Sequence, residues 1–318
     1  MDNQKLNNWI LDHAHTLDIK IERMEWIKEW FPEYYDFNVK ACFEGNIIEG
    51  RGIDKDQDSA LLKAFSELIE RIACKHLGIR SNGVAAHFNK NMARENAKKE
   101  LIERDAILSH FLTSEPFFLK EVFPWMNEFE KRLLSIGLEV SFGEAYSSVS
   151  DCHVVACKVL GREKFGAFWG YGNDYDLSKA YHHAALECMV NVSAYLYGAY
   201  RPQRIDLESF NRLSIVNGVD HQRLHYTQDL LKLEVGQPSI DDKEVLNLEE
   251  IEVVNIEITS IGDFSSVPLF VCRATSKRLQ NIFYREPHTD VINLNRLEQF
   301  SGRKLTFDDV LLTPHPIG

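Results

Sequence analysis

The feature that most constrains this chain is a helix pattern that occurs three times. The pattern Ala-x-x-x-Ala-x-x-Glu recurs with its glutamates at Glu67, Glu100 and Glu187. Residues three and four apart lie on one face of a helix, so each copy would present two small side chains and one carboxylate together. The alanines would let another element approach closely. The recurrence predicts a pseudo-repeated fold around a shared site.

The first two copies extend to the identical sequence Glu-Leu-Ile-Glu-Arg, at Glu67–Arg71 and Glu100–Arg104. Their second glutamates, Glu70 and Glu103, share a helix face with the first. Close carboxylates repel each other, and Mg2+ removes that cost because it prefers carboxylate oxygens and leaves positions for water and phosphate. Ordinary solvated helices are the alternative, since residues of this kind are common helix formers. The recurrence in register favours a magnesium–nucleotide site, to which the third copy, with Val190 in the second position, would contribute less.

Glycine-containing turns are expected before the three helices. Gly50–Gly52 and Gly170–Gly172 each lie eight residues before the first alanine of a helix, and the middle helix follows Ser81–Gly83. Asp58 and Asp176 are the expected helix-start residues after the first and last of these turns.

Apolar spacing predicts the other elements. The predicted helices cover residues 60–78, 92–112, 128–136 and 178–197, and the predicted strands cover residues 138–146, 153–160, 251–258 and 269–274. Helices interleave with strands, so the expected fold class is mixed α/β, of the α+β kind. Trp9, Trp26 and Trp30, with nearby apolar residues, indicate an amphipathic helix pair. We therefore expect a helical extension over residues 1–39 and a single domain over residues 40–318.

Charge and composition exclude several classes of partner. The net charge of -12 argues against a broad surface for nucleic acid or an anionic membrane, whereas a small ATP pocket remains possible because Mg2+ supplies local positive charge. No apolar run approaches the roughly 20 residues of a membrane span, and the N-terminus has no secretory h-region. Six scattered cysteines predict thiols in a reducing cytoplasm. His182 and His183 point about 100° apart on a helix, so a shared zinc ion is not favoured.

The ordered set of motifs resembles the YcaO-domain family over roughly residues 40–318. The resemblance rests on the three glycine and Ser-Asn-Gly segments, each followed by its helix motif, on Asp105-Ala106 after the second motif, and on the late segment Val267–Arg273. It implies a single YcaO-like domain with pseudo-repeated helix–sheet units around an ATP- and Mg2+-binding site. The combination is far more specific than any one motif.

The family's chemistry is the activation of peptide backbone amides. In azoline-forming members, a Cys, Ser or Thr side chain of a ribosomally made peptide attacks the preceding carbonyl. ATP phosphorylates the resulting oxygen, and loss of phosphate leaves a thiazoline or oxazoline. The resemblance therefore implies first a cyclodehydratase. The alternatives are a thioamide- or amidine-forming enzyme, or a subunit that binds nucleotide or peptide without turnover.

The resemblance also implies roles for individual residues. Phosphoryl transfer needs mainly positioning and charge neutralisation, which carboxylates and arginines can supply. The implied Mg2+ ligands are Glu67, Glu70, Glu100 and Glu103, and the implied nucleotide-binding residues are Ser81, Asn82, Arg104, Arg273 and Glu187.

The C-terminal tail resembles the Pro-x-Pro-x-Pro end of azoline-forming members, with Gly318 in place of the last proline. Proline fixes φ, so such a tail can be held in place at lower entropic cost. The implied catalytic residues are Pro314, His315, Pro316 and Gly318, with His315 as a proton-transfer or positioning group. A disordered chain end is the alternative reading of this segment.

Departures from the family pattern concern one loop and the partners. His87 and Phe88 replace the family's Gly-Asn, and Met92 replaces a glutamate, which leaves the number of Mg2+ ions open. His87 could bind phosphate or metal, or be structural. No segment resembles the family's peptide-clamping E1-like domain. The expected partners are a precursor peptide and an E1-like leader-recognition protein in a hetero-oligomer, with a flavin-dependent azoline dehydrogenase as a further candidate.

Overall fold

The computed structural model describes residues 2–119, 123–149, 151–161, 167–196, 233–235, 248–283 and 289–310. The chain divides into two compact units. Unit 1 comprises Met1–Leu101 and Ile251–Thr275, and unit 2 comprises Ile102–Glu250 and Ser276–Gly318. The division falls within one helix, α3 (Lys90–Thr113), so the two halves of this helix belong to different units.

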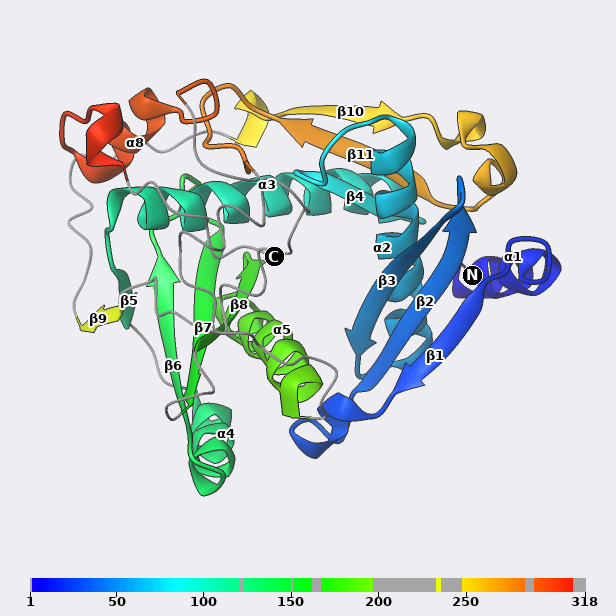
Figure 1. Cartoon of the computed structure of the whole chain (residues 1–318), viewed down its shortest axis with the longest axis horizontal. Coiled ribbons are helices and arrows are strands. Elements are labelled where there is room, and N and C mark those ends of the chain that lie inside the picture. Colours follow the sequence, from blue (N-terminus) through cyan, green and yellow to red (C-terminus); the bar gives the residue numbers. More distant parts are fainter. Residues whose placement is uncertain are drawn as a thin grey trace. The chain divides into compact units, whose positions relative to one another are not determined.

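Unit 1 contains two antiparallel three-stranded sheets (Figure 1). The first has the order β1 (Lys20–Met24), β2 (Tyr35–Phe43), β3 (Asn46–Asp54), and the second has the order β10 (Glu252–Ile256), β11 (Phe270–Thr275), β4 (Val84–His87). Helix α2 (Gln57–His76) packs against β3 and β2, and α1 (Asp2–His13) contacts α2. Phe65, Leu68 and Ile72 of α2 are fully buried in the core of this unit.

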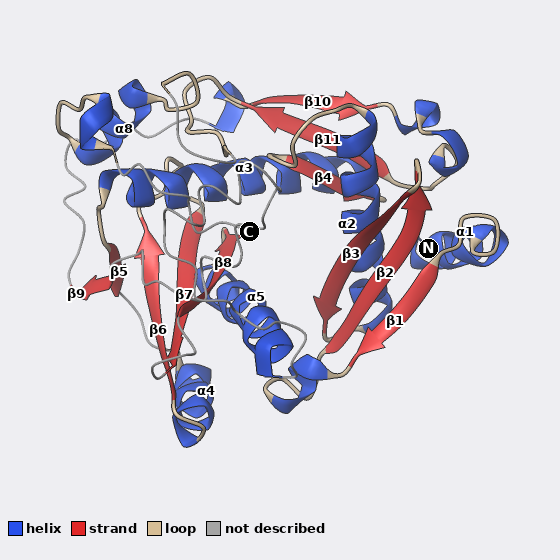
Figure 2. Ribbon diagram, viewed as in Figure 1, coloured by secondary structure: helices blue, strands red, loops and turns tan. Residues whose placement is uncertain are grey.

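Unit 2 is built on a five-stranded sheet (Figure 2). Its order is β8 (Ala167–Asp174), β7 (His153–Gly161), β6 (Leu138–Ala145), β5 (Phe117–Leu119), β9 (Leu233–Val235), antiparallel except for the parallel pair β5–β9. Helix α5 (Leu177–Leu196) packs against β8 and β7, and α4 (Pro124–Ser135) packs against β6. A short helix, α8 (Leu294–Ser301), begins at the cap residue Asn293 and ends at Gly302, whose φ of 68° suits glycine.

The architecture confirms the expected mixed α/β class and the eight elements read from apolar spacing, with ends shifted by a few residues. Helices α2 to α5 and strands β6, β7, β10 and β11 match those eight segments. None of the helices in the described part of the chain has both the length and the apolar character needed to cross a membrane.

Three local expectations need correction. The segments Gly50–Gly52 and Gly170–Gly172 are not turns, because they lie within strands β3 and β8. The cap of α2 is Asp56, which accepts the Ser59 N–H, rather than Asp58. Asp176 does cap α5 through the Lys179 N–H.

The N-terminal segment is the third correction. Only its first part, α1, is an α-helix, whereas residues 20–24 form the exposed edge strand β1, which pairs with β2. Trp26 begins a 3-10 helical turn, and the predicted boundary after residue 39 falls inside β2. The charged sequence of β1 has no row of apolar residues on one face. Its pairing with β2 therefore depends on backbone hydrogen bonds, which a side-chain pattern does not predict.

Candidate functional site

Each copy of the helix motif forms the same contact with the strand before it. A backbone N–H of the strand donates to the first glutamate of the following helix, sixteen residues later in every case. The three pairs are Arg51 N to Glu67 Oε2 at 2.6 Å, Val84 N to Glu100 Oε2 at 2.9 Å, and Tyr171 N to Glu187 Oε2 at 2.9 Å. The strand–helix pairs β3–α2, β4–α3 and β8–α5 are therefore three copies of one repeat, which we number copies 1, 2 and 3.

The glycines and alanines of the motif serve the close approach of strand and helix. A Cβ on Gly52 would lie 2.1 Å from the backbone oxygen of Ala60, and a Cβ on Gly172 would lie 2.3 Å from that of Ala180. Side chains have no room where a strand backbone touches a helix backbone. The small residues thus bring each glutamate within reach of its strand.

The turn between strand and helix is also repeated, and its hydrogen bond accounts for the presence of His87 at this position. In copies 1 and 3, Asp54 and Asp174 accept the N–H of the residue two positions later. His87 occupies the same position of copy 2, and its Nδ1 accepts the Asn89 N–H at 2.9 Å. Asn89 in turn caps α3 through the Met92 N–H. This geometry supports the structural reading of His87.

The second glutamates connect successive copies. Glu70 of copy 1 accepts the Ala86 N–H at 2.6 Å, and Glu103 of copy 2 accepts Asn173 Nδ2 at 2.5 Å. Ala86 and Asn173 occupy the same position in the strands of copies 2 and 3. The first contact lies within unit 1 and the second within unit 2. Copy 3 has Val190 at this position, so the series of carboxylates ends there.

Burial makes the charged form of both second glutamates unfavourable. Burial raises the pKa of Glu70 well above its ordinary value, and the nearby charges of Glu100 and Glu67 raise it further, against the opposing effects of the Ala86 hydrogen bond and Arg71. Burial also raises the pKa of Glu103, against the opposing effects of Arg104 and Asn173. A bound cation would relieve this cost, so these oxygen donors fit Mg2+.

In copy 1, the carboxylate oxygens of the first glutamate already accept hydrogen bonds. Both oxygens of Glu67 have partners, because Oε1 also accepts Arg71 Nη2 at 2.6 Å. Among the described residues, no three His, Cys, Asp or Glu side chains gather as a metal-binding group. Mg2+ usually takes one or two carboxylates and completes its octahedron with water and phosphate, so such a gathering is not required.

The expected nucleotide-binding residues lie in both units. Arg273 sits on β11 opposite Val84 of β4, and its Nε is buried without a hydrogen-bond partner in the described part of the chain. A buried guanidinium N–H of this kind fits an anionic oxygen. Ser81 forms a side-chain hydrogen bond with Cys74 of α2. In unit 2, burial and the charge of Glu187 raise the pKa of Tyr171, and the positive charge of Arg104 opposes this increase. Tyr171 lies one position before Gly172.

Other predicted groups fall elsewhere. The tail residues Pro314, His315, Pro316 and Gly318 lie outside the described residues. His182 packs against Trp125, with ring centroids 5.1 Å apart, and His183 is exposed. Asn173 was not anticipated as a site residue, although its place one residue after the Gly-x-Gly segment could have suggested it.

Comparisons with known proteins identify the fold. No protein-family model and no curated protein sequence matches the chain. A solved structure of YcaO from Methanopyrus kandleri bound with AMPPCP and Mg2+ matches with a TM-score of 0.58 and 14% identity, over 88% of this chain and 91% of that one. A heterocyclase in complex with substrate and cofactor matches with a TM-score of 0.63 and 10% identity, over 98% of this chain and 57% of that one. At these identities the likeness is one of fold.

Proposed function

From the premise that this chain has the YcaO fold, we propose that it is an ATP- and Mg2+-dependent cyclodehydratase. It would form thiazoline or oxazoline rings in a ribosomally made precursor peptide. The observation that carries the proposal is the pair of second glutamates, Glu70 and Glu103, each of which accepts a hydrogen bond from the same position of the next strand–helix copy. The M. kandleri structure, which holds AMPPCP and Mg2+, supports the choice of nucleotide and metal.

The chain's own residues divide into cation-binding and anion-binding groups. Glu67, Glu70, Glu100 and Glu103 would hold Mg2+ through carboxylate oxygens. Both oxygens of Glu67 also accept hydrogen bonds, from the Arg51 N–H and from Arg71. The bound nucleotide supplies the phosphoryl group that converts an amide oxygen into a leaving group.

The anion-binding side rests on positive charge and on hydrogen-bond donors. Arg273 would direct its buried Nε–H to phosphate oxygens, and Arg104 would neutralise charge that develops there. Ser81 and Asn82 would shape the loop that meets the nucleotide. Glu187 would act as one further acceptor, because its Oε2 is already fixed by Tyr171.

Two other functions follow from specific departures in the sequence. Gly318 in place of a proline keeps open a thioamide- or amidine-forming enzyme with the same ATP chemistry. Phe88 and Met92 favour a subunit that binds nucleotide or peptide without turnover. The turn contact of His87 weakens this last alternative, because it gives one altered loop residue a structural role.

The partners and the location belong to the same proposal. The enzyme would work in the cytoplasm in a hetero-oligomer with an E1-like leader-recognition protein and, for azole products, a flavin-dependent dehydrogenase. The proposed catalytic residues of the tail are Pro314, His315, Pro316 and Gly318, with His315 as a proton-transfer or positioning group. The six cysteines, all in the described part of the chain, form no disulfide.

Two measurements test the proposal in order. Titration calorimetry of the chain with AMPPCP and Mg2+ should show binding that disappears when Mg2+ is chelated. Co-expression with a candidate precursor and its neighbouring proteins, followed by mass spectrometry, should then show loss of one water per modified residue. Exchange of oxygen for sulfur would instead identify thioamide formation. A reconstituted complex that binds nucleotide but neither modifies peptide nor consumes ATP would establish the non-catalytic alternative.

A further inference from the structure

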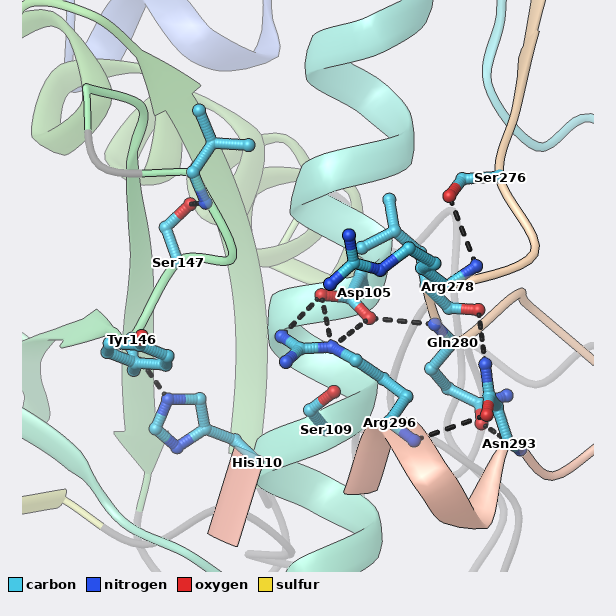
Figure 3. A network of polar contacts seen from close by, with 12 residues as sticks. Asp105, Ser109, His110, Tyr146, Ser147, Ser276, Arg278, Gln280, Asn293 and Arg296 are labelled. Carbon is cyan, nitrogen blue, oxygen red and sulfur yellow. Dashed lines mark hydrogen bonds and ion pairs between the residues drawn. The ribbon is translucent and has the colours of Figure 1, made fainter. Parts of the chain in front are cut away.

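A buried ion pair directly follows the second motif on α3. Asp105 is fully buried and Arg296 is 3% exposed. Two guanidinium nitrogens donate to the carboxylate: Nε to Oδ1 at 3.0 Å and to Oδ2 at 3.1 Å, and Nη2 to Oδ2 at 2.8 Å. The Gln280 N–H adds a third donor to Oδ1 at 2.7 Å. Figure 3 shows the Arg296 guanidinium and the Gln280 backbone converging on the Asp105 carboxylate.

The partners of Asp105 are tied to each other as well. Gln280 Oε1 accepts the Asn293 N–H at 2.8 Å, and Asn293 Oδ1 accepts the Arg296 N–H at 3.2 Å as the cap of α8. Four residues, Asp105, Gln280, Asn293 and Arg296, thus form a closed ring of hydrogen bonds, which we call the Asp105 clamp. All four lie in unit 2. Asn293 and Gln280 therefore hold Arg296 in place, in addition to its ion pair with Asp105 of α3.

Helix α3 is held on a second side two residues earlier. Glu103 accepts Asn173 Nδ2 from β8 at 2.5 Å, also within unit 2. Residues two apart on a helix point roughly 200° from each other, so Glu103 and Asp105 face nearly opposite directions. Arg104 lies between them in the sequence. Helix α3 is thus hydrogen-bonded to β8 through Glu103 on one side and to the other residues of the Asp105 clamp through Asp105 on the other.

Directional contacts add to apolar packing at α3. Hydrophobic burial has no preferred direction, whereas a hydrogen bond does. A forked guanidinium–carboxylate pair defines both the plane and the distance of its partners. An ion pair of this kind is not needed for stability as such, since packed apolar residues often serve as well.

We propose that Asp105 and Arg296 are positioning residues, which fix the rotation of α3 and so direct Glu103 and Arg104 toward magnesium and phosphate. The inference rests on the proposed function, because it assigns the clamp to the same site. It predicts that binding of magnesium–nucleotide depends on the geometry of the clamp more than on the stability that the clamp provides.

The test compares three changes with a matched control. Arg296→Lys keeps the charge and removes the fork. Asp105→Asn keeps an oxygen for Gln280 and removes the charge. The double change Asp105→Leu with Arg296→Met removes both charges together, which should recover stability relative to either single loss. Leu133→Ala is the control, because Leu133 is a fully buried residue of α4 and takes no part in the site.

Two readouts are needed, each taken below the unfolding temperature of every variant. The first is the dissociation constant for AMPPCP with Mg2+, and the second is hydrogen exchange of the backbone amides of residues 102–106 in the ligand-free chain. We expect the three clamp variants to bind roughly tenfold or more weakly, since small misplacements of binding groups have effects of this size, and to exchange faster at those amides. Leu133→Ala should bind like the unaltered chain. The double variant should still bind AMPPCP and Mg2+ weakly, even where its stability recovers.

The outcomes separate this inference from the proposed function. An unaltered chain that binds no magnesium–nucleotide refutes the proposed function, and the inference falls with it. An unaltered chain that binds, together with clamp variants that bind equally well, overturns the inference alone. The inference is also overturned if Leu133→Ala weakens binding as much as Arg296→Lys, or if exchange at residues 102–106 is unchanged.

Discussion

The backbone N–H of Val84 donates to the carboxylate of Glu100 at 2.9 Å. A glutamate proposed to bind magnesium therefore also fastens strand β4 to helix α3. The same double role applies to Glu70, which fastens the Ala86 N–H. One carboxylate can serve both purposes, because each of its oxygens has two lone pairs. Variants of these residues must consequently be chosen to separate the structural contact from the charge.

Glutamine at position 100 should achieve that separation. Glu100→Gln keeps an acceptor for the Val84 N–H, so we expect a small change in the free energy of unfolding and a loss of Mg2+-dependent AMPPCP binding. Glu100→Ala leaves that buried N–H without its acceptor and should lower the unfolding free energy by about 1–3 kcal/mol. Urea unfolding and calorimetry provide the two measurements. Undiminished binding by Glu100→Gln would remove Glu100 from the proposed magnesium ligands.

The glycines of the strand–helix repeat should be intolerant of a methyl group. A Cβ on Gly170 would lie 2.0 Å from the backbone nitrogen of Cys188. Because backbone atoms cannot turn aside, we expect Gly170→Ala to destabilise the protein by about 3 kcal/mol or more. Gly137→Ala is the matched control, since Gly137 has a φ of 80° and open space around it, and should cost about 1–2 kcal/mol. Equal unfolding temperatures for the two variants would contradict the repeat packing.

The turn role of His87 can be tested with asparagine. His87→Asn restores a short side-chain acceptor for the Asn89 N–H, as in the Asp54 and Asp174 turns. It should leave the unfolding free energy nearly unchanged. His87→Ala should lower it by about 1 kcal/mol, the typical cost of losing such a contact. Neither change should alter AMPPCP affinity. A marked loss of affinity in His87→Asn would revive phosphate or metal binding by this histidine.

Thiol labelling should distinguish one cysteine from the rest. Cys42 is exposed and the other five are buried. Burial, followed by the charges of Glu70 and Glu100, raises the pKa of Cys74 to about 11. At about pH 8 that thiol stays protonated and unreactive, because the thiolate is the nucleophile. Mass spectrometry after brief maleimide treatment should show one added label, and none after Cys42→Ser. Rapid labelling of the Cys42→Ser variant would contradict the burial of the remaining thiols.

Much of the fold was predictable where one face of an element is buried. Helices α2 to α5 and strands β6, β7, β10 and β11 show the apolar periods of helix and strand. Strands β3 and β8 were misread at their Gly-x-Gly segments, because glycine usually marks a turn. Those glycines belong to strands because a helix backbone lies against them, and a sequence does not show that contact.

By itself, the sequence determined the repeat and the identity of the carboxylates. Alanine and glutamate at fixed spacing specify a helix face, and three copies of that face specify the repeat. Only the tertiary structure decided what each carboxylate holds. Glu103 meets Asn173 seventy residues away, and Asp105 meets Arg296 191 residues away. Such partners cannot be read from a sequence, because the chain contains many asparagines and arginines with the same side-chain donors, and the fold decides which of them lies near a buried carboxylate.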